Sequence, residues 1–218
     1  MNLADLTFKQ RVAQTAITYA PIYESVYLRY EYLVCSEAFS SQDYYIIAAC
    51  ADNYRHLIGV NTAISAEDFF EKCLSGTLTE DDFDFVKNGQ PEAAVKGSVR
   101  RKINALPGFV AMLHSPLVAQ EKFVKNKVSC TFATTDKCVT VGYITVGKSR
   151  PKTLLKGDEL EEEKCKKVDL ILRRPSGDDF FNEIVCGDAN MIAKYKAKIE
   201  PLLAECLRPN EAMDMALV

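Results

Sequence analysis

Apolar residues recur at helical spacing near the beginning of the chain. From Leu3 to about Tyr23 they lie mostly three or four positions apart, until Pro21 interferes with the pattern. They occupy Leu6, Val12, Ala13, Ala16, Ala20 and Tyr23. This one-sided pattern predicts an amphipathic helix that packs on another part of the fold.

Two segments rich in aromatic and β-branched residues follow this helix. They cover residues 25–37 and 43–50, and the Ser-Ser-Gln turn between them is typical of a pair of hairpin strands. We expect the segment Asn53–Val60 to supply a third short strand or the residues that lead into it.

The middle of the chain carries residues that favour helix starts. Ser65 and Thr79 each stand three residues before an aspartate, and their side-chain oxygens can accept a free backbone N–H. The first helix is expected over residues 66–74, before Gly76. A further helix is expected over residues 91–106, with a proline near its first turn.

The second half of the chain alternates between strand and loop patterns. Strands are expected at Val128–Thr134, Cys138–Gly147, Lys167–Arg173 and Phe180–Val185. The charged segment 156–167 predicts a solvated loop, and a closing helix is expected over residues 189–206, interrupted or ended by Pro201. Together these elements predict one α+β domain over residues 1–218, with a curved, largely antiparallel sheet packed against the N-terminal helix and further helices.

Composition is typical of a folded, soluble chain. With 48% apolar and 26% charged residues, disorder and a collagen-like structure are excluded. The first residues do not resemble a signal peptide, so we expect none, and no uncharged run is apolar enough to span a bilayer. The 8 cysteines form no Cys-x-x-Cys pair, and no Cys or His pair has zinc-ligand spacing. We therefore expect reduced core cysteines in a cytoplasmic protein, with no membrane association and no metal or other cofactor.

The net charge of -3 hides three unequal blocks. Residues 1–95 carry 6 Lys and Arg against 14 Asp and Glu, residues 96–156 carry 12 against 2, and residues 157–218 carry 9 against 14. The middle block, at +10, takes its cations from a helix, a connecting segment and a strand end. If these lie on one face they would attract a polyanion, and if they are scattered they are simply solvated lysines.

One segment matches the phosphate-loop pattern G-x-x-x-x-G-K-[ST]. It runs from Gly142 to Ser149, but its intervening Tyr-Ile-Thr-Val favours a strand, and Pro151 follows closely. A phosphate loop needs a flexible turn before a helix, so we expect a strand here and no nucleotide site. The acidic run over residues 80–84 lacks the glycine and the final acid of a calcium loop.

His56 is the first candidate for acid–base chemistry. It stands at the mouth of the expected third strand, with Arg55 before it and Gly59 three positions on. An imidazole can transfer protons near neutral pH. The alternative is a structural imidazole that is hydrogen-bonded at a strand end. The second histidine, His114, lies in a proline-flanked turn and is expected to be an exposed loop residue.

Several motifs, in the same order, resemble the PBECR4 family. This family groups phage- and mobile-element-borne members of the barnase, EndoU, colicin E5/D and RelE-like assemblage. The resemblance covers roughly residues 10–190 and rests on four motifs: Asn53-x-x-His56-Leu57-x-Gly59, residues 66–78, Gly142-Tyr143, and residues 150–155.

The resemblance implies a BECR-like α+β domain that acts as a metal-independent, toxin-like ribonuclease. Its partners would be RNA, such as a tRNA or an mRNA, and a protein inhibitor. In this chemistry the ribose 2′-hydroxyl attacks the adjacent phosphate, which requires a base, an acid and cations around the phosphoryl oxygens.

The motif match carries over His56 as catalytic acid or base, with Thr153 and Lys152 as phosphate contacts. Charge and position add Arg55 beside the catalytic histidine and Arg101 on the substrate side. The remaining expected substrate contacts are Arg100, Lys148, Arg150 and Tyr143. We expect these cations to surround His56.

A function from another class remains open at this point. The chain could be a catalytically inert nucleic-acid- or protein-interaction module of a mobile element, binding its partner through the acidic ends. A buried, fully hydrogen-bonded His56 without cationic neighbours would favour this module.

Overall fold

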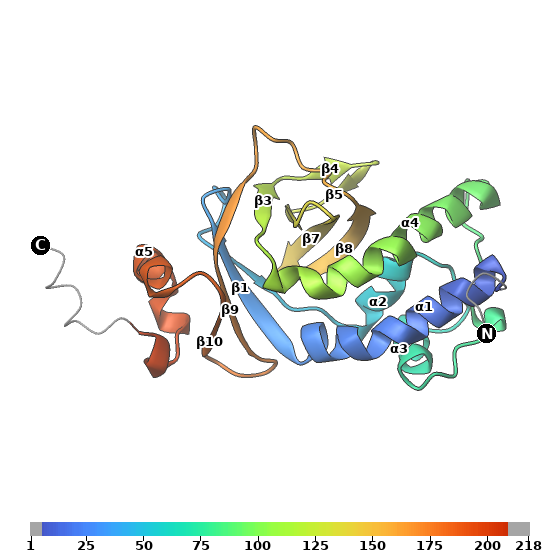
Figure 1. The fold of residues 1–218 in the computed structure, drawn as a ribbon, viewed down its shortest axis with the longest axis horizontal. Coiled ribbons are helices and arrows are strands. Elements are labelled where there is room, and N and C mark those ends of the chain that lie inside the picture. Colours follow the sequence, from blue (N-terminus) through green and yellow to red (C-terminus); the bar gives the residue numbers. More distant parts are fainter. Residues whose placement is uncertain (1–5, 209–218) are drawn as a thin grey trace, which may run out of the picture.

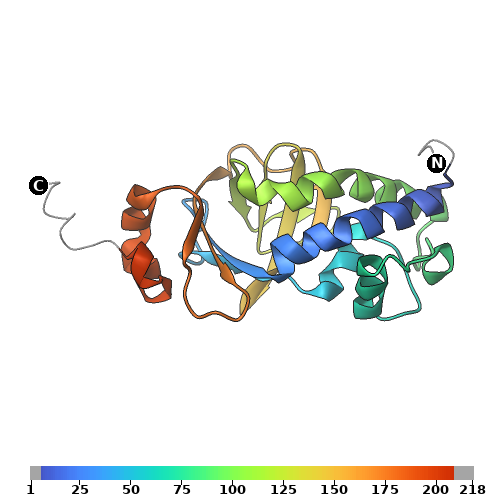
Figure 2. The ribbon, with the colours of Figure 1, turned by 60° about the horizontal axis from the view of Figure 1, so that its bottom comes forward.

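The computed structural model describes residues 6–208 as a strand barrel with helices at both ends (Figure 1). The α-helices are α1 (Phe8–Tyr23), α2 (Ala51–Ile58), α3 (Ala66–Leu74), α4 (Glu92–Ala111) and α5 (Ala189–Ile199). The strands are β1 (Tyr30–Ser36), β2 (Tyr45–Ile47), β3 (Val118–Glu121), β4 (Val124–Lys125), β5 (Val128–Ser129), β6 (Phe132–Thr135), β7 (Val139–Val146), β8 (Lys148–Lys156), β9 (Lys166–Pro175) and β10 (Glu183–Cys186). Figure 2 shows α5 at one end of the barrel and the other four helices toward the opposite end.

Seven strands close into the barrel in the order β1-β2-β8-β7-β6-β3-β9, because β9 pairs with β1 as well as with β3. The short β10 adds to the free part of β9. All these pairings are antiparallel except that of β2 with β8. The α+β class and the antiparallel character agree with the sequence, but the expected curved sheet is a closed barrel. Closure depends on pairing between segments near opposite ends of the chain, which no local pattern reveals.

Aromatic rings fill the core that joins the barrel to the helices. Tyr45, Phe132 and Tyr143 stack in series, with ring centroids 4.4 and 4.7 Å apart. Tyr27 stacks on Phe109 of α4 at 4.4 Å and donates a hydrogen bond to its backbone carbonyl. Stacked rings of this kind add to the free energy gained by burying their area.

The first helix ends at Tyr23, as the sequence predicts, but a helical turn and not a strand follows it. A capping box between Thr7 and Gln10 starts α1, which runs through Pro21 and continues as a π-helical turn, Glu24–Leu28. β1 therefore begins at Tyr30 and not at Ser25. Burial of Tyr27 against α4 outweighs the strand preference of these aromatic and β-branched residues. The expected first residues, 3–5, lie outside the described part of the chain.

The expected third strand is wrong, because Ala51–Ile58 forms helix α2. Its buried residues Asn53, Tyr54, Leu57 and Ile58 follow helical spacing. The backbone N–H of Cys50 donates to the Asn53 side chain at 2.9 Å, which completes the start of the helix. Gly59 ends it in the left-handed conformation, with φ +87°. A short run such as Tyr-Arg-His-Leu-Ile is compatible with either element by pattern alone.

Other elements agree with the sequence except at their ends. α3 has the predicted residues and the predicted Ser65 cap, whereas Thr79 begins only a 3-10 turn, Glu80–Asp82. α4 extends past Pro107 to Ala111, and α5 stops at Ile199 before the turn that contains Pro201. The expected strand Val128–Thr134 is split into β5 and β6. The sequence prediction missed β3, β4 and β8.

The phosphate-loop match lies in the β7–β8 hairpin, as its strand-like residues predict. Gly147 makes the turn with φ +71°, and β8 begins directly after it at Lys148. Pro151 is accommodated inside β8 beside a register shift between Gly142 and Tyr143 of β7. A hairpin has no helix N-terminus to receive a phosphate.

The cysteines form no disulfide. Cys35, Cys73 and Cys130 are buried, as expected of core cysteines, and burial raises the pKa of Cys35 and of Cys73 to about 12. Cys138 and Cys206 are exposed, so the expectation that the cysteines are core residues is wrong for these two. Among residues 6–208, no helix has the length and apolar character needed to cross a bilayer.

Candidate functional site

His56 lies in the last turn of α2, on the side facing away from the core. Each of the other three named residues in the Asn53-x-x-His56-Leu57-x-Gly59 motif has a structural role: Asn53 caps the helix, Leu57 is buried, and Gly59 ends it. The imidazole of His56 is exposed and makes no hydrogen bond to any residue in the described part of the chain. Within this motif, only the histidine side chain has no structural explanation.

Helix α2 lies beside β8, a strand that is only partly paired with β2. β2 pairs with β8 at a single position, Ile47 with Ser149, because β2 has only 3 residues. The rest of this edge of β8 has no strand partner among residues 6–208. Helices α2 and α4 both contact β8. This packing brings the end of α2 next to α4 (Figure 1).

Lys102 of α4 reaches the end of α2. Its ammonium group donates a hydrogen bond to the backbone carbonyl of His56. Its aliphatic chain crosses Gly59 so closely that a Cβ atom there would lie 2.7 Å from Cδ of Lys102. The C-terminal carbonyls of a helix attract cations, so Lys102 both caps α2 and places a positive charge beside His56.

Three cations shape the electrostatics around His56. Partial burial, then Arg55 and Lys102, lower the pKa of His56 below its ordinary value, with a smaller contribution from Lys87 and an opposing one from Asp52. Burial, followed by the charge of Lys87, also lowers the pKa of Lys102 to about 8. The imidazole is therefore neutral near pH 7, the form that a general base requires.

Two buried polar atoms of this cluster have no hydrogen-bond partner among the described residues. They are Oδ1 of Asp52 and Nε of Arg55, both on α2. Buried polar atoms usually find a partner, because leaving one unpaired costs roughly 1–3 kcal/mol. We refer to Asp52, Arg55, His56, Lys87 and Lys102 as the α2 cluster.

Three of the cations predicted from the sequence have partners elsewhere in the protein. Arg100 turns toward α1, with its guanidinium 5.0 Å from the ring centre of Phe8. Lys148 pairs with the buried Glu31, and Lys152 donates to the carbonyl of Ser129 at 2.9 Å. Arg101 and Arg150 are exposed. None of these five is among the charges that act most strongly on the pKa of His56, and the contacts of Arg100, Lys148 and Lys152 do not fit the expected ring of cations.

Two further predicted contacts are inside the protein. Tyr143 is fully buried in the barrel, where it stacks on Phe132, so its ring is not free to contact a substrate. Thr153 is only 8% exposed, and its methyl group would lie 2.9 Å from a Cβ atom on Gly142. The Gly142-Tyr143 motif and Thr153 thus pack the β7–β8 pair, and neither side chain is placed as a catalytic group.

Sequence reasoning missed Asp52, Lys87 and Lys102 as members of the site. Asp52 stands one helical turn before His56. Had α2 been predicted as a helix, Asp52 and His56 would have been placed on the same face of it. Lys87 and Lys102 reach His56 through tertiary packing, and no spacing in the sequence indicates either approach.

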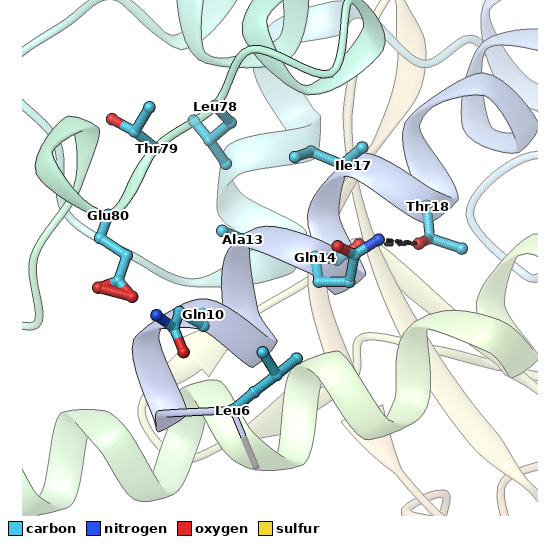
Figure 3. A pocket seen from close by; sticks show the side chains of 9 residues that line it. All are labelled: Leu6, Gln10, Ala13, Gln14, Ile17, Thr18, Leu78, Thr79 and Glu80. Atoms are coloured by element: carbon cyan, nitrogen blue, oxygen red, sulfur yellow. Dashed lines mark hydrogen bonds between the residues drawn. The ribbon is translucent and has the colours of Figure 1, made fainter. Parts of the chain in front are cut away.

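A separate hollow of about 690 Å³ lies between α1 and residues 78–80, in the segment that follows α3 (Figure 3). It is lined by Leu6, Gln10, Ala13, Gln14, Ile17, Thr18, Leu78, Thr79 and Glu80. Glu80 is the titratable side chain in this lining, and none of these residues is a cation or a histidine, so the hollow offers no positive charge to a phosphate. Among residues 6–208, no group of three or more His, Cys, Asp and Glu side chains is placed to hold a metal ion.

Comparison with protein families agrees with the motifs. The family model PBECR4, described as phage-Barnase-EndoU-ColicinE5/D-RelE like nuclease4, matches residues 19–180. Because the match covers most of the chain, this protein belongs to the PBECR4 family of nuclease-like domains. α2, β7 and β8 lie inside the match, and α5 lies beyond it. No curated protein and no solved structure matches the sequence.

Proposed function

We propose that this chain is a metal-independent endoribonuclease in which His56 is the general base. The observation that carries the proposal is the exposed imidazole of His56, which has no structural hydrogen bond and lies beside three cations within the PBECR4 match. A proton-accepting group surrounded by positive charge suits cleavage of a phosphodiester.

In the proposed reaction, neutral His56 takes the proton of a ribose 2′-hydroxyl as its oxygen attacks the adjacent phosphorus atom. The bond from phosphorus to the 5′-oxygen breaks, leaving a 2′,3′-cyclic phosphate and a 5′-hydroxyl end. Arg55 and Lys87 would stabilise the charge on the phosphoryl oxygens. Lys102, with its pKa of about 8, is the candidate acid for the leaving 5′-oxygen.

Three of the cations predicted from the sequence remain candidates for more distant RNA contacts. The side chains of Arg101 and Arg150 are exposed and make no ion pair within residues 6–208. Lys152 is exposed as well, although its ammonium group already bonds the carbonyl of Ser129. Lys148 is not included, because it is paired with Glu31.

The inert interaction module has less support. It would be favoured by a buried, hydrogen-bonded His56 without cationic neighbours, and the imidazole here is exposed, without a hydrogen bond, and beside Arg55 and Lys102. Nucleotide hydrolysis has no support either, because the matching segment is a hairpin.

The direct test uses purified protein, labelled tRNA and mixed cellular RNA in excess EDTA. His56→Ala is compared with His114→Ala, which removes the other histidine of the chain, also exposed. We expect wild type and His114→Ala to cleave, and His56→Ala to be slower by about 100-fold or more. Equal cleavage by His56→Ala, or no cleavage by wild type, would contradict the proposal.

A further inference from the structure

The hairpin formed by β4 and β5 has a turn whose backbone conformation is unfavourable for the lysine that it contains. Val124 pairs with Ser129 and Lys125 with Val128, which leaves Asn126 and Lys127 as a two-residue turn. Both have positive φ, 50° and 64°. This is the geometry of a type I′ turn, in which glycine is strongly preferred at the second position because it has no Cβ atom.

A second lysine has the same kind of backbone where the hairpin begins. Lys122, with φ 54°, follows β3 directly, and its N–H donates to the carbonyl of Thr131 at 2.7 Å. Beneath the hairpin, Phe123 and Cys130 are buried and hold its base against the barrel. The hairpin is therefore a fixed platform that carries lysines in sterically unfavourable positions.

No contact of the Lys122 or Lys127 side chain explains why a lysine stands at these positions. Both are exposed, and neither makes a hydrogen bond or an ion pair with any residue between 6 and 208. The neighbouring Lys125 differs, because it pairs with Glu159 at 2.5 Å. Glycine at 122 or 127 would suit the backbone better, so what the lysine side chains add at these two positions is positive charge.

We propose that Lys122 and Lys127 form a docking site for the phosphate backbone of single-stranded RNA, separate from the α2 cluster. Two ammonium groups on a rigid hairpin can each approach a phosphate without losing an existing ion pair. The choice of RNA as the occupant rests on the proposed function, since a nuclease family member requires a polyanionic substrate. A protein with an acidic surface would be a different occupant, and the test separates the two.

The hairpin offers substitutions that remove the charge without harming the fold. Lys127→Gly and the double variant Lys122→Gly with Lys127→Gly remove the lysines and relieve the backbone at the same positions. Lys137→Gly is the matched control, because Lys137 is also an exposed lysine with positive φ, at 75°, but it lies in the β6–β7 turn and not on the β4–β5 hairpin that carries the proposed pair of lysines. All three should unfold at the same temperature as the parent protein or at a higher one.

Binding is measured by fluorescence anisotropy with a labelled single-stranded RNA, in a His56→Ala background so that the RNA stays intact. We expect the double variant to bind at least about threefold more weakly at low salt, with its log–log salt slope reduced by about 0.7 for each lost contact. Lys137→Gly should match the parent in both respects.

Affinity and salt slope equal to those of Lys137→Gly, or no RNA binding by the parent, would overturn the docking site. So would an equal loss in Lys137→Gly, because the effect would then reflect net charge alone. Cleavage by the protein with His56 intact is measured separately. Failure of the hairpin to bind is therefore distinguishable from failure of His56 to catalyse.

Discussion

The ammonium group of Lys102 donates a hydrogen bond to the backbone carbonyl of His56, across a glycine that leaves room for its side chain. This contact joins α4 to the end of α2 and places a half-buried cation beside the candidate base. It also gives Gly59 two roles, since the glycine both ends α2 and admits Lys102.

Gly59→Ala should destabilise the protein more than Gly76→Ala. Both glycines have left-handed backbones, with φ +87° and +74°, so each substitution carries a conformational cost of roughly 1 kcal/mol. A Cβ atom at position 76 meets nothing within 4 Å, whereas one at 59 meets Lys102 at 2.7 Å. Urea unfolding should show a loss larger by about 1 kcal/mol for Gly59→Ala than for Gly76→Ala, because Lys102 must move and give up its hydrogen bond to the carbonyl of His56. Equal losses would mean that Lys102 moves aside freely.

The imidazole of His56 should titrate below the ordinary histidine pKa of about 6.5. Replacing Lys87 or Lys102 by Met should raise this pKa, because a nearby like charge disfavours the imidazolium. Titration of the imidazole by NMR checks both statements. The control is Lys96→Met, because Lys96 lies on α4 like Lys102. A pKa at or above 6.5 in wild type, or one unchanged in both variants, would contradict the described cluster.

The lowered pKa of His56 also predicts the sign of a stability effect. The unfolded chain binds the proton more readily than the folded protein does. This contribution therefore makes the free energy of unfolding fall as the pH drops from about 6.5 through the folded-state pKa. His56→Ala should remove it, so unfolding of wild type and variant should differ in pH dependence over this range. Parallel curves would contradict the assignment.

Lys102→Met should have an effect on stability that depends on pH. The folded pKa of about 8 lies below the unfolded value near 10.5, so the cost of holding the charge is full below pH 8 and disappears as the pH rises toward 10.5. The free energy of unfolding of Lys102→Met, relative to that of wild type, should therefore be higher at pH 7 than at pH 9.5. Urea unfolding at the two values measures the difference, and a difference independent of pH would contradict the burial of this charge.

Glu31→Gln should be far more destabilising than Lys148→Met. Glu31 is buried and accepts two hydrogen bonds from Arg174, at 3.0 and 2.7 Å, as well as one from Lys148. Without the carboxylate, Arg174 becomes an uncompensated buried charge, at a cost of roughly 3 kcal/mol. Lys148 is half-exposed, and its loss should cost about 1 kcal/mol or less. Similar losses in denaturant unfolding would show that Lys148 holds the network.

The same carboxylate predicts an acid-sensitive contribution to stability. Burial raises the pKa of Glu31, but the hydrogen bonds from Lys148 and Arg174 outweigh it, and the net pKa is lowered. The stabilisation is therefore present above the unfolded pKa and is lost as the pH falls through the folded one. Glu31→Gln should remove this acid dependence, which unfolding midpoints between pH 6 and pH 3 would reveal.

The sequence by itself determined the elements whose pattern is long or clearly capped. The one-sided apolar spacing of α1 and the Ser65 cap of α3 encode a helix locally, and the strand-like residues of β7 contradicted the phosphate-loop match. The ordered motifs were sufficient to indicate the family, which the match over residues 19–180 confirms. They also singled out His56.

Only the tertiary structure decided the barrel and the surroundings of His56. β1 and β9 pair although they are far apart in the sequence, and that pairing changes an open sheet into a closed barrel. The short run in α2 became a helix that packs against β8 and α4, and this packing brings Lys102 across Gly59. Periodicity reports which face of a segment is buried, whereas the partner on that face depends on contacts that form only when distant segments pack together.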